Sequence, residues 1–298
     1  GKHTAQFSTI AREDPNSGTA NQAPATVSEK ILGAIQAHED ALGCRVGFSL
    51  MMPSENVHIA RHGDVLFHPA STMKVPVMIE TFRQAAEGNF AMDDKVEVVT
   101  TFESFIDGSE FTAGPSSRLR DHVGKNVTIL KLVEDMMEVS DNVATNMLVI
   151  MCGPRKITAT MRGLGAEKSY VIRPLMDEQA YQAGLSNRMT PDGLSILKQR
   201  IVEGDAGTDA HTKEMMRIME AQEYRDKIPA GVPEGVTVGN KTGSITAHRH
   251  DTGYVLAPFG NYYITILIDG LKDGDAGNAA AADISRVVYE TLDEEFGG

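Results

Sequence analysis

The sequence holds little cysteine, a deficit of positive charge and no long apolar run. Only two cysteines occur among its 298 residues, too few for a disulfide framework. Lysine and arginine total 28 against 41 aspartates and glutamates, and the formal net charge of −13 argues against nucleic acid or an anionic membrane as a partner. No stretch of eighteen apolar residues is present that could span a bilayer. With 41% hydrophobic residues, the composition is that of an ordinary globular protein, large enough for one large domain or two intertwined ones.

The chain opens with a polar stretch rich in Ser, Thr, Asn, Gln and Ala. This stretch does not show the charged start, apolar centre and cleavage site of a secretory signal peptide. We therefore expect residues 1–26 to form a disordered leader or the start of an already processed protein. We also expect Cys44 and Cys152 to stay unbridged, because they fall in different predicted domains and a disulfide needs Cα atoms within ~7 Å.

Hydrophobic periodicity places strands at both ends of the chain and helices between them. The expected elements are a helix from Ser28 to Gly43, strands at 45–52 and 56–61, helices between Ser71 and Gly207 with starts at Thr128 and Thr190, strands at 236–238, 252–256 and 262–268, and a closing helix at 278–296. This order predicts an α/β (α+β) fold, in which residues 27–70 and 208–298 form one sheet domain flanked by the first and last helices. Residues 71–207 would form an inserted all-helical domain.

A serine and a lysine spaced for one helical face provide the first candidate for chemistry. Ser71 and Lys74 are three residues apart, so a helix places both side chains together. A serine hydroxyl needs a base to attack, and a lysine that is desolvated and close to a second cation can serve. By itself the spacing is far more often structural. Ser195 and Lys198 show it too, on a helix face that we expect to be solvated.

Two further motifs are modest when taken singly. Ser140-Asp141-Asn142 follows an amphipathic helix and, alone, is best interpreted as a helix cap. Lys241-Thr242-Gly243 lies on a predicted strand, where the plain interpretation is a strand edge with a bulge at the glycine. A phosphate-binding loop is rejected, because an asparagine precedes the lysine and no helix starts after it.

The three motifs together, in this order, resemble the class A β-lactamase family, within the superfamily of serine β-lactamases and penicillin-binding proteins. The likeness runs from about Val27 to the C-terminus. LGCRVGFSL resembles the first strand of that family, FHPASTMK its nucleophile segment, and GPRKITATMRGLG the helix after its Ser-Asp-Asn loop.

The resemblance implies a role for each motif residue. Ser71 would attack a β-lactam carbonyl, Lys74 would help to take the proton, and Ser140 would pass a proton to the leaving nitrogen. The remaining residues would bind the substrate: its amide at Asn142, its carboxylate at Lys241 and Thr242, and its oxyanion at the N–H groups of Ser71 and Ser244, with Gly243 in the same strand segment.

One departure from the family pattern concerns deacylation. In the family, a glutamate in a loop after the central helices activates the water that releases the acyl group. The loop arginine falls on Arg173, which places Leu175 where that glutamate is expected, and Asn187 replaces the aspartate that pairs with the arginine. Asp177 and Glu178 are the candidate substitute bases.

Further expectations follow from the resemblance. The substrate would be a small molecule, a β-lactam or a D-alanyl-D-alanine-like peptide, bound by a monomer without cofactor or metal, in the periplasm or outside a bacterial cell. Rival functions are a D-alanyl-D-alanine carboxypeptidase, a penicillin-binding protein or an esterase on the same scaffold, and a non-catalytic binding module. A metal site at His248, His250 and Asp251 is not favoured, because no further ligand cluster accompanies them.

Overall fold

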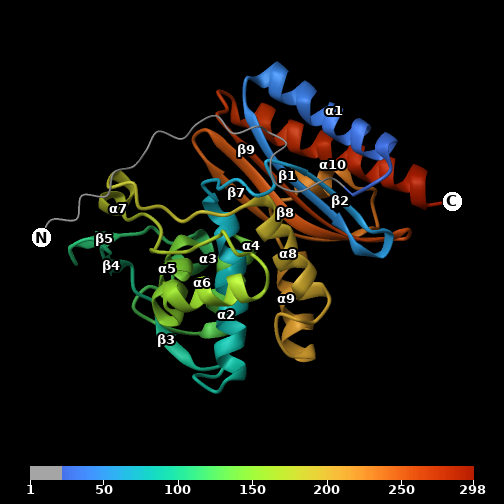
Figure 1. Ribbon diagram of the computed structural model, residues 1–298. Coiled ribbons are helices and arrows are strands. Elements are labelled where there is room, and N and C mark those ends of the chain that lie inside the picture. The colour runs from blue at the N-terminus through green and yellow to red at the C-terminus, as the bar shows by residue number, and fades with distance from the viewer. Residues whose placement is uncertain (1–21) are drawn as a thin grey trace, which may run out of the picture.

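Both ends of the chain contribute to a five-stranded antiparallel sheet, which confirms the predicted architecture (Figure 1). The computed structural model describes residues 22–298, so residues 1–21 of the predicted leader lie outside the described residues. The strand order is β2-β1-β9-β8-β7. The strands are β1 (Arg45–Met52), β2 (Val57–Arg61), β7 (Thr237–Ile245), β8 (His248–Ala257) and β9 (Gly260–Asp269).

The central strand β9 is buried on both of its faces, which explains its almost continuous apolar sequence. Tyr262, Ile264 and Ile268 belong to the core beneath the first and last helices, whereas Tyr263 and Leu267 belong to the core shared with the helical region. The sheet therefore forms the common wall between two hydrophobic cores.

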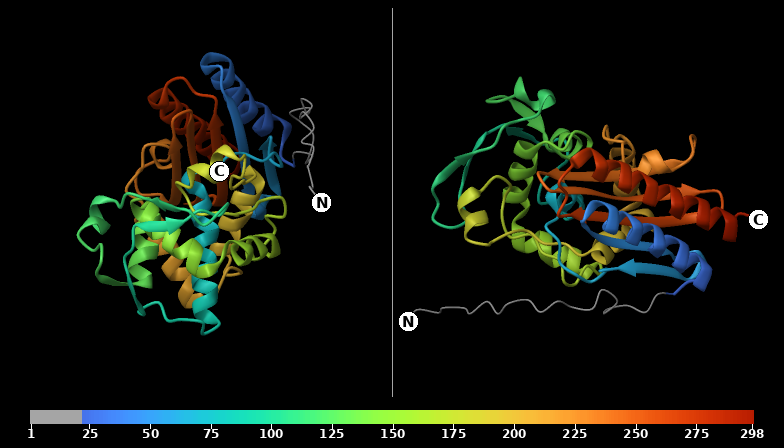
Figure 2. Two further views of the ribbon diagram at one scale, coloured as in Figure 1. Left: turned by 90° about the vertical axis from the view of Figure 1, so that its left-hand side faces the viewer. Right: turned by 90° about the horizontal axis from the view of Figure 1, so that it is seen from above.

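Helices α1 (Ala25–Leu42) and α10 (Gly274–Phe296) lie side by side over one face of this sheet (Figure 2). α1 begins before the predicted cap Ser28, because the carbonyl oxygen of Pro24 accepts from the N–H groups of Val27 and Ser28, both at 3.1 Å. It ends at Gly43 as predicted, where φ is 61° and glycine carries no steric penalty.

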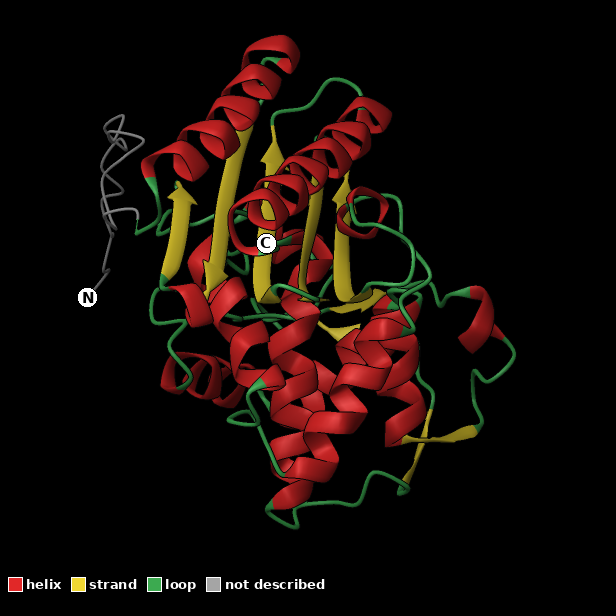
Figure 3. Ribbon diagram, turned by 90° about the vertical axis from the view of Figure 1, so that its right-hand side faces the viewer, coloured by secondary structure: helices red, strands yellow, loops and turns green. Residues whose placement is uncertain are grey.

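The residues between the two sheet segments form a mainly helical region below the strand ends (Figure 3). Its helices are α2 (Lys74–Ala86), α3 (Ser117–Arg120), α4 (Ile129–Glu138), α5 (Asn142–Cys152), α6 (Pro154–Gly163), α7 (Glu178–Gln182) and α8 (Pro191–Val202). The predicted starts of α4 and α8 are confirmed. The side chain of Thr128 accepts from Lys131 N, and that of Thr190 accepts from Gly193 N.

The inserted region also contains two small sheets, so it is not all-helical as predicted. β3 (Lys95–Glu97) pairs with β6 (Asn126–Thr128), and β4 (Thr101–Glu103) pairs with β5 (Glu110–Thr112). Phe102 lies directly opposite Phe111 in the β4–β5 hairpin. Such aromatic cross-strand pairs stabilise a short hairpin where the sequence has no helical apolar stripe.

The predicted division at residues 70/71 and 207/208 stays a prediction. Helix α9 (Asp209–Glu220) packs against α4, α8 and β7, so it contacts both regions. Cys44 precedes β1 and Cys152 ends α5, and both thiols are free. Across residues 22–298, no helix combines the length and the apolar character that crossing a membrane requires.

The Ser195–Lys198 pair lies in the interior, and our expectation of a solvated face was wrong. Both side chains are completely buried, because α8 packs against β1, β8 and β9 on one side and against α9 on another. Ser195 Oγ lies 2.9 Å from Thr265 Oγ1, and Lys198 Nζ donates to Leu194 O at 3.0 Å. The sequence could not show that distant strands would cover this polar side of the helix.

Replacing Lys198 by methionine should stabilise the protein. Burial lowers the pKa of Lys198 well below the ordinary 10.5, so the unfolded chain binds a proton that the folded chain excludes. Burial of Lys198 lowers the free energy of unfolding. This loss is largest at pH values below the pKa of Lys198 in the folded protein, and it disappears as the pH rises toward 10.5, the pKa in the unfolded chain. We expect Lys198→Met to raise the free energy of unfolding by about 1–3 kcal/mol at neutral pH, and by less at alkaline pH.

Urea unfolding at several pH values measures this difference. Lys213→Met, on the exposed side of α9, is the matched control. A loss of stability in Lys198→Met, or a gain that is equal at every pH, would contradict the burial of an uncharged amine.

Candidate active site

The three sequence motifs meet where the start of α2, the α4–α5 turn and the edge strand β7 come together. Ser71 lies in a 3₁₀ turn, η2 (Ala70–Met73), that leads directly into α2 and packs against β7 and β8. The same cleft holds Lys74, Ser140 and Lys241. The predicted grouping of these residues is therefore present in space.

The turn that presents Ser71 is unusual in its backbone. Ala70 has φ of 46°, a left-handed conformation that non-glycine residues rarely adopt. Lys74 is the first residue of α2, so the nucleophile and the lysine lie one turn apart, as their spacing predicts. Ser71 is half-buried, and its Oγ has no hydrogen-bond partner within residues 22–298. The hydroxyl thus faces an open pocket.

Lys74 is completely buried and surrounded by oxygen atoms of the α4–α5 turn. Its Nζ donates to Ser140 O at 2.7 Å and lies 3.1 Å from Ser140 Oγ and 3.0 Å from Asn142 Oδ1. Desolvation, and then the nearby charge of Lys241, lower the pKa of Lys74 well below its ordinary value, while Asp141 opposes the shift. An uncharged amine at this position can accept a proton.

In the Ser-Asp-Asn turn, Asp141 stabilises the start of α5, whereas Ser140 and Asn142 contact Lys74. Asp141 caps α5, with Oδ1 accepting from Ala144 N at 2.7 Å, so the helix-cap interpretation holds for this residue. Ser140 has φ of 60°, which turns its side chain and carbonyl toward Lys74. Because Asn142 Oδ1 is occupied by Lys74, its amide nitrogen remains to donate elsewhere.

The β7 wall holds a second buried lysine. Lys241 is completely buried, its Nζ donates to Thr242 O at 3.0 Å, and desolvation lowers its pKa to about 7. Asp251, which pairs with Thr242 across β7 and β8, opposes that shift. Gly243 lies so close to the nucleophile turn that an added Cβ would be 3.0 Å from Ser71 N. Only glycine allows this approach of strand and turn.

A pocket of about 430 Å³ opens between Ser71, Ser140 and β7. Lys227 and Arg249 line it together with Thr242, and Lys227 is only 3% exposed. Asp226 also lines the pocket and forms an ion pair with Lys227 at 2.8 Å, so Arg249 is the cation here that has no carboxylate partner among residues 22–298. The sequence analysis missed Lys227, because it belongs to none of the three motifs.

A second pocket, of about 260 Å³, lies on the other side of Ser71. Leu175 lines it together with Asn142, Asp177 and Glu178. The amide of Asn146 holds the backbone of Leu175 from both sides, accepting from Leu175 N at 2.7 Å and donating to Leu175 O at 2.9 Å. Leu175 is therefore fixed at the pocket by a residue that the sequence analysis did not single out.

The loop around Leu175 is held together by hydrogen bonds, and no ion pair joins Arg173 to Asn187. Asn187 Oδ1 accepts from Ile172 N and Arg173 N at 2.8 and 3.2 Å, and its amide donates to Arg173 O at 3.1 Å. The Arg173 side chain donates to the carbonyl oxygens of Pro174 and Leu185. Hydrogen bonds between these two side chains and the backbone hold this loop.

The two candidate substitute bases differ in availability. Asp177 is buried and accepts from Ser104 Oγ at 3.0 Å, Phe105 N at 2.9 Å and Ala180 N at 3.1 Å. Its carboxylate is committed to holding the loop and capping α7. Glu178 is exposed, lines the pocket and, among residues 22–298, accepts only from Gln182 Nε2, at 3.1 Å.

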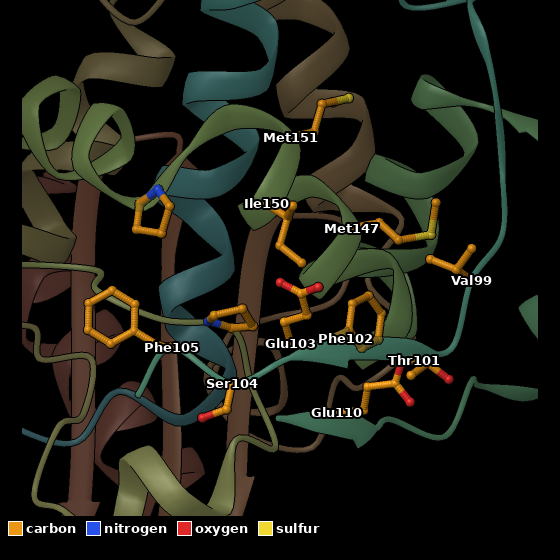
Figure 4. Close-up of a pocket in the computed structure, with 12 residues that line it drawn as sticks. Val99, Thr101, Phe102, Glu103, Ser104, Phe105, Glu110, Met147, Ile150 and Met151 are labelled. Carbon is orange, nitrogen blue, oxygen red and sulfur yellow. The ribbon is translucent and has the colours of Figure 1, made fainter. Parts of the chain in front are cut away.

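A third pocket, of about 720 Å³, lies between the β4–β5 hairpin and the outer face of α5 (Figure 4). Met147, Ile150 and Met151 form its α5 wall, and none of the motif residues lines it. In the part of the chain that the structure describes, no cluster of three or more His, Cys, Asp or Glu is arranged to hold a metal ion.

The comparisons with known proteins agree with this geometry. The sequence model of the Beta-lactamase enzyme family matches residues 28–292. The chain is 26% identical over 262 residues to Beta-lactamase FAR-1 of Nocardia farcinica, covering 86% of this chain and 81% of that protein. It is 29% identical to a solved β-lactamase of Sphaerobacter thermophilus, with a TM-score of 0.78 over 89% of this chain and 97% of that one.

A further solved structure shows the same fold at lower identity. It is described as a leucine-to-glutamate mutant of PBP-A in an acyl-enzyme complex with penicillin G, and it is 22% identical, with a TM-score of 0.79 over 93% of this chain and 100% of that one. The family match spans nearly the whole described chain, including all three motifs. The protein therefore belongs to the β-lactamase enzyme family and is a serine hydrolase of the β-lactamase type.

Proposed function

We propose that the protein opens the β-lactam ring through an acyl-Ser71 intermediate and releases the acyl group slowly. The main support is the convergence of Ser71 with a buried Lys74 that contacts Ser140 and whose pKa is lowered by desolvation. The family model and FAR-1 are both described as β-lactamases, which favours this activity over the carboxypeptidase, penicillin-binding protein and esterase alternatives.

Acylation uses residues that are all in place. Ser71 Oγ attacks the lactam carbonyl carbon, and its proton passes to the uncharged amine of Lys74. The carbon–nitrogen bond of the ring then breaks, and the leaving nitrogen receives a proton from Ser140, which Lys74 replenishes across 3.1 Å. The N–H groups of Ser71 and Ser244 would stabilise the oxyanion.

Substrate binding draws on both walls of the cleft. The carboxylate would lie in the pocket of Lys227 and Arg249, beside Lys241 and Thr242. The free amide nitrogen of Asn142 would donate to the substrate amide on the side of Leu175. All of these groups come from one chain, so a monomer suffices. By family analogy, we place the protein in the bacterial periplasm or outside the cell.

In this proposal, deacylation is the slow step of the reaction. A leucine cannot take a proton from water, and Leu175 occupies the wall of the pocket beside Ser71. Of the two nearby carboxylates, we propose Glu178 as the substitute base, because Asp177 already accepts three different donors.

Ser71→Ala should abolish covalent labelling by β-lactams without loss of the fold. The hydroxyl makes no hydrogen bond within the described chain, so its removal costs little packing. Intact-protein mass spectrometry after incubation with benzylpenicillin detects the adduct in the wild type. Labelling that survives in Ser71→Ala, mapped to Ser140 or Ser195, would overturn the assignment of the nucleophile.

Wild-type protein should show a burst of about one equivalent of hydrolysed nitrocefin, followed by slow turnover. Leu175→Glu should raise the deacylation rate constant by roughly 10²–10⁴-fold, because general base catalysis is typically worth that factor. Leu175→Gln is the matched control, because glutamine has the shape of glutamate but cannot act as a base. Fast steady-state turnover in the wild type, or equal rates in the two variants, would contradict the proposed role of this position.

Glu178→Gln should lower the residual deacylation rate, whereas Asp177→Asn should mainly lower stability. Asp177 accepts three donors through its two oxygens, and asparagine keeps only one of these oxygens, so a buried donor loses its partner at a cost of about 1–3 kcal/mol. Single-turnover release of the acyl group and thermal unfolding, measured on both variants, separate the two effects. A slower release in Asp177→Asn alone, with unchanged stability, would identify Asp177 as the base instead.

A further inference from the structure

Two histidines outside the three motifs hold the turn that carries the nucleophile. His250, on β8, is completely buried, and its Nε2 lies 2.9 Å from the carbonyl oxygen of His68. His68 in turn accepts from Ala70 N through its Nδ1, at 3.2 Å. One imidazole thus closes the His68-Pro69-Ala70-Ser71 turn, and the other ties that turn to the sheet.

The protonation state of both rings follows from their partners. A carbonyl oxygen only accepts, so His250 must carry its proton on Nε2. A backbone N–H only donates, so His68 must carry its proton on the Nε2 that faces away from Ala70. Consistent with this, His250 Nδ1 is buried without a partner in the described chain, and desolvation lowers the pKa of His250 to about 3 and of His68 to about 4. Both rings are uncharged at physiological pH.

The turn needs external support, because Ala70 is held at φ of 46°. A non-glycine residue in this region costs about 1–3 kcal/mol and persists only where its surroundings enforce it. β7 approaches the turn too closely for a side chain at Gly243, and His250 lies directly opposite Gly243 in the sheet register. Gly243 of β7 therefore packs against the turn that carries Ser71, and His250 of β8 is hydrogen-bonded to the same turn.

We propose that His250 is a positioning residue for Ser71, acting through the hydrogen bond from its Nε2 to the carbonyl oxygen of His68. This bond fixes the nucleophile turn against β7, which supplies Lys241, Thr242 and the N–H of Ser244. The inference rests on the proposed function for the reaction it serves, but the bond itself is a property of the free protein.

His250→Phe and His250→Gln test the bond. Phenylalanine keeps a ring of similar size without a donor, whereas the glutamine amide nitrogen can take the place of Nε2. With benzylpenicillin, we expect His250→Phe to lower the acylation rate constant about 10–100-fold, because small displacements of reacting groups have effects of this size. The dissociation constant of the pre-covalent complex should change little, and His250→Gln should keep most of the wild-type rate. His38→Gln, on α1, is the control.

A merely structural histidine would give a different pattern. Acylation by His250→Phe at the wild-type rate, or equal impairment of both variants, would overturn the inference. If His250→Phe does not fold, His250→Asn replaces it, because its shorter amide cannot reach the carbonyl of His68. Ala70→Gly, which removes the penalty of positive φ, should restore part of the rate lost in the impaired variant.

Hydrogen exchange of the free protein decides the inference without any β-lactam. Amides of residues 67–74 should exchange faster in His250→Phe than in the wild type and His250→Gln. Unchanged exchange would overturn the role of His250 even if acylation were slow. A wild-type protein that forms no adduct would overturn the proposed function, and the exchange experiment would still test the histidine.

Discussion

Two lysines buried beside one hydroxyl impose the main constraint on this structure. Lys74 and Lys241 are both completely removed from solvent, and the charge of Lys241 adds to the desolvation that lowers the pKa of Lys74. Moving an ammonium group out of water is so unfavourable that the group sheds its proton unless an anion compensates. Asp141 and Asp251 compensate only in part. The lowered pKa that would let Lys74 act as a base is thus a product of burial.

This burial exists only because the two regions of the molecule pack together. Lys74 begins a helix and is surrounded by oxygens of the α4–α5 turn, whereas Lys241 belongs to the edge strand of the sheet. Neither element can desolvate its own lysine. The hydrophobic cores on the two faces of the sheet hold these elements in contact, so the chemistry of the cleft depends on packing far from it.

Backbone strain is concentrated at the same cleft. Among the described residues, five non-glycines have positive φ, and three of them lie at the walls of the site: Ala70, Ser140 and Met176. Each precedes or contains a group with a task in the cleft, respectively Ser71, the Ser140 hydroxyl and Asp177. Strained conformations of this kind need many restraints, and here they come from Lys74, the two histidines and the Ser104–Asp177 contact.

In the proposed cycle, Leu175 distinguishes acylation from deacylation. Asn146 holds the backbone of Leu175 by two hydrogen bonds, so the loop presents an apolar side chain to the pocket. The proposed acylation uses groups from η2, α2, the α4–α5 turn and β7, all of which match the motifs. The proposed deacylation would use this loop, where Asp177 holds the structure and Glu178 is exposed to solvent.

The sequence by itself determined the features that rest on local pattern. Alternation and helical periodicity predicted the sheet from both chain ends, the caps Thr128 and Thr190 and the end of α1 at Gly43, because these depend on neighbouring residues. The order of the three motifs indicated the family, which the family model confirms, and predicted Ser71 as the nucleophile. Tertiary structure alone decided which side chains are enclosed and what they contact. Lys198 is buried because distant strands cover α8, and His250 meets the carbonyl of a residue 182 positions away. Contacts of that range leave no periodicity in the sequence, since they depend on how whole elements pack.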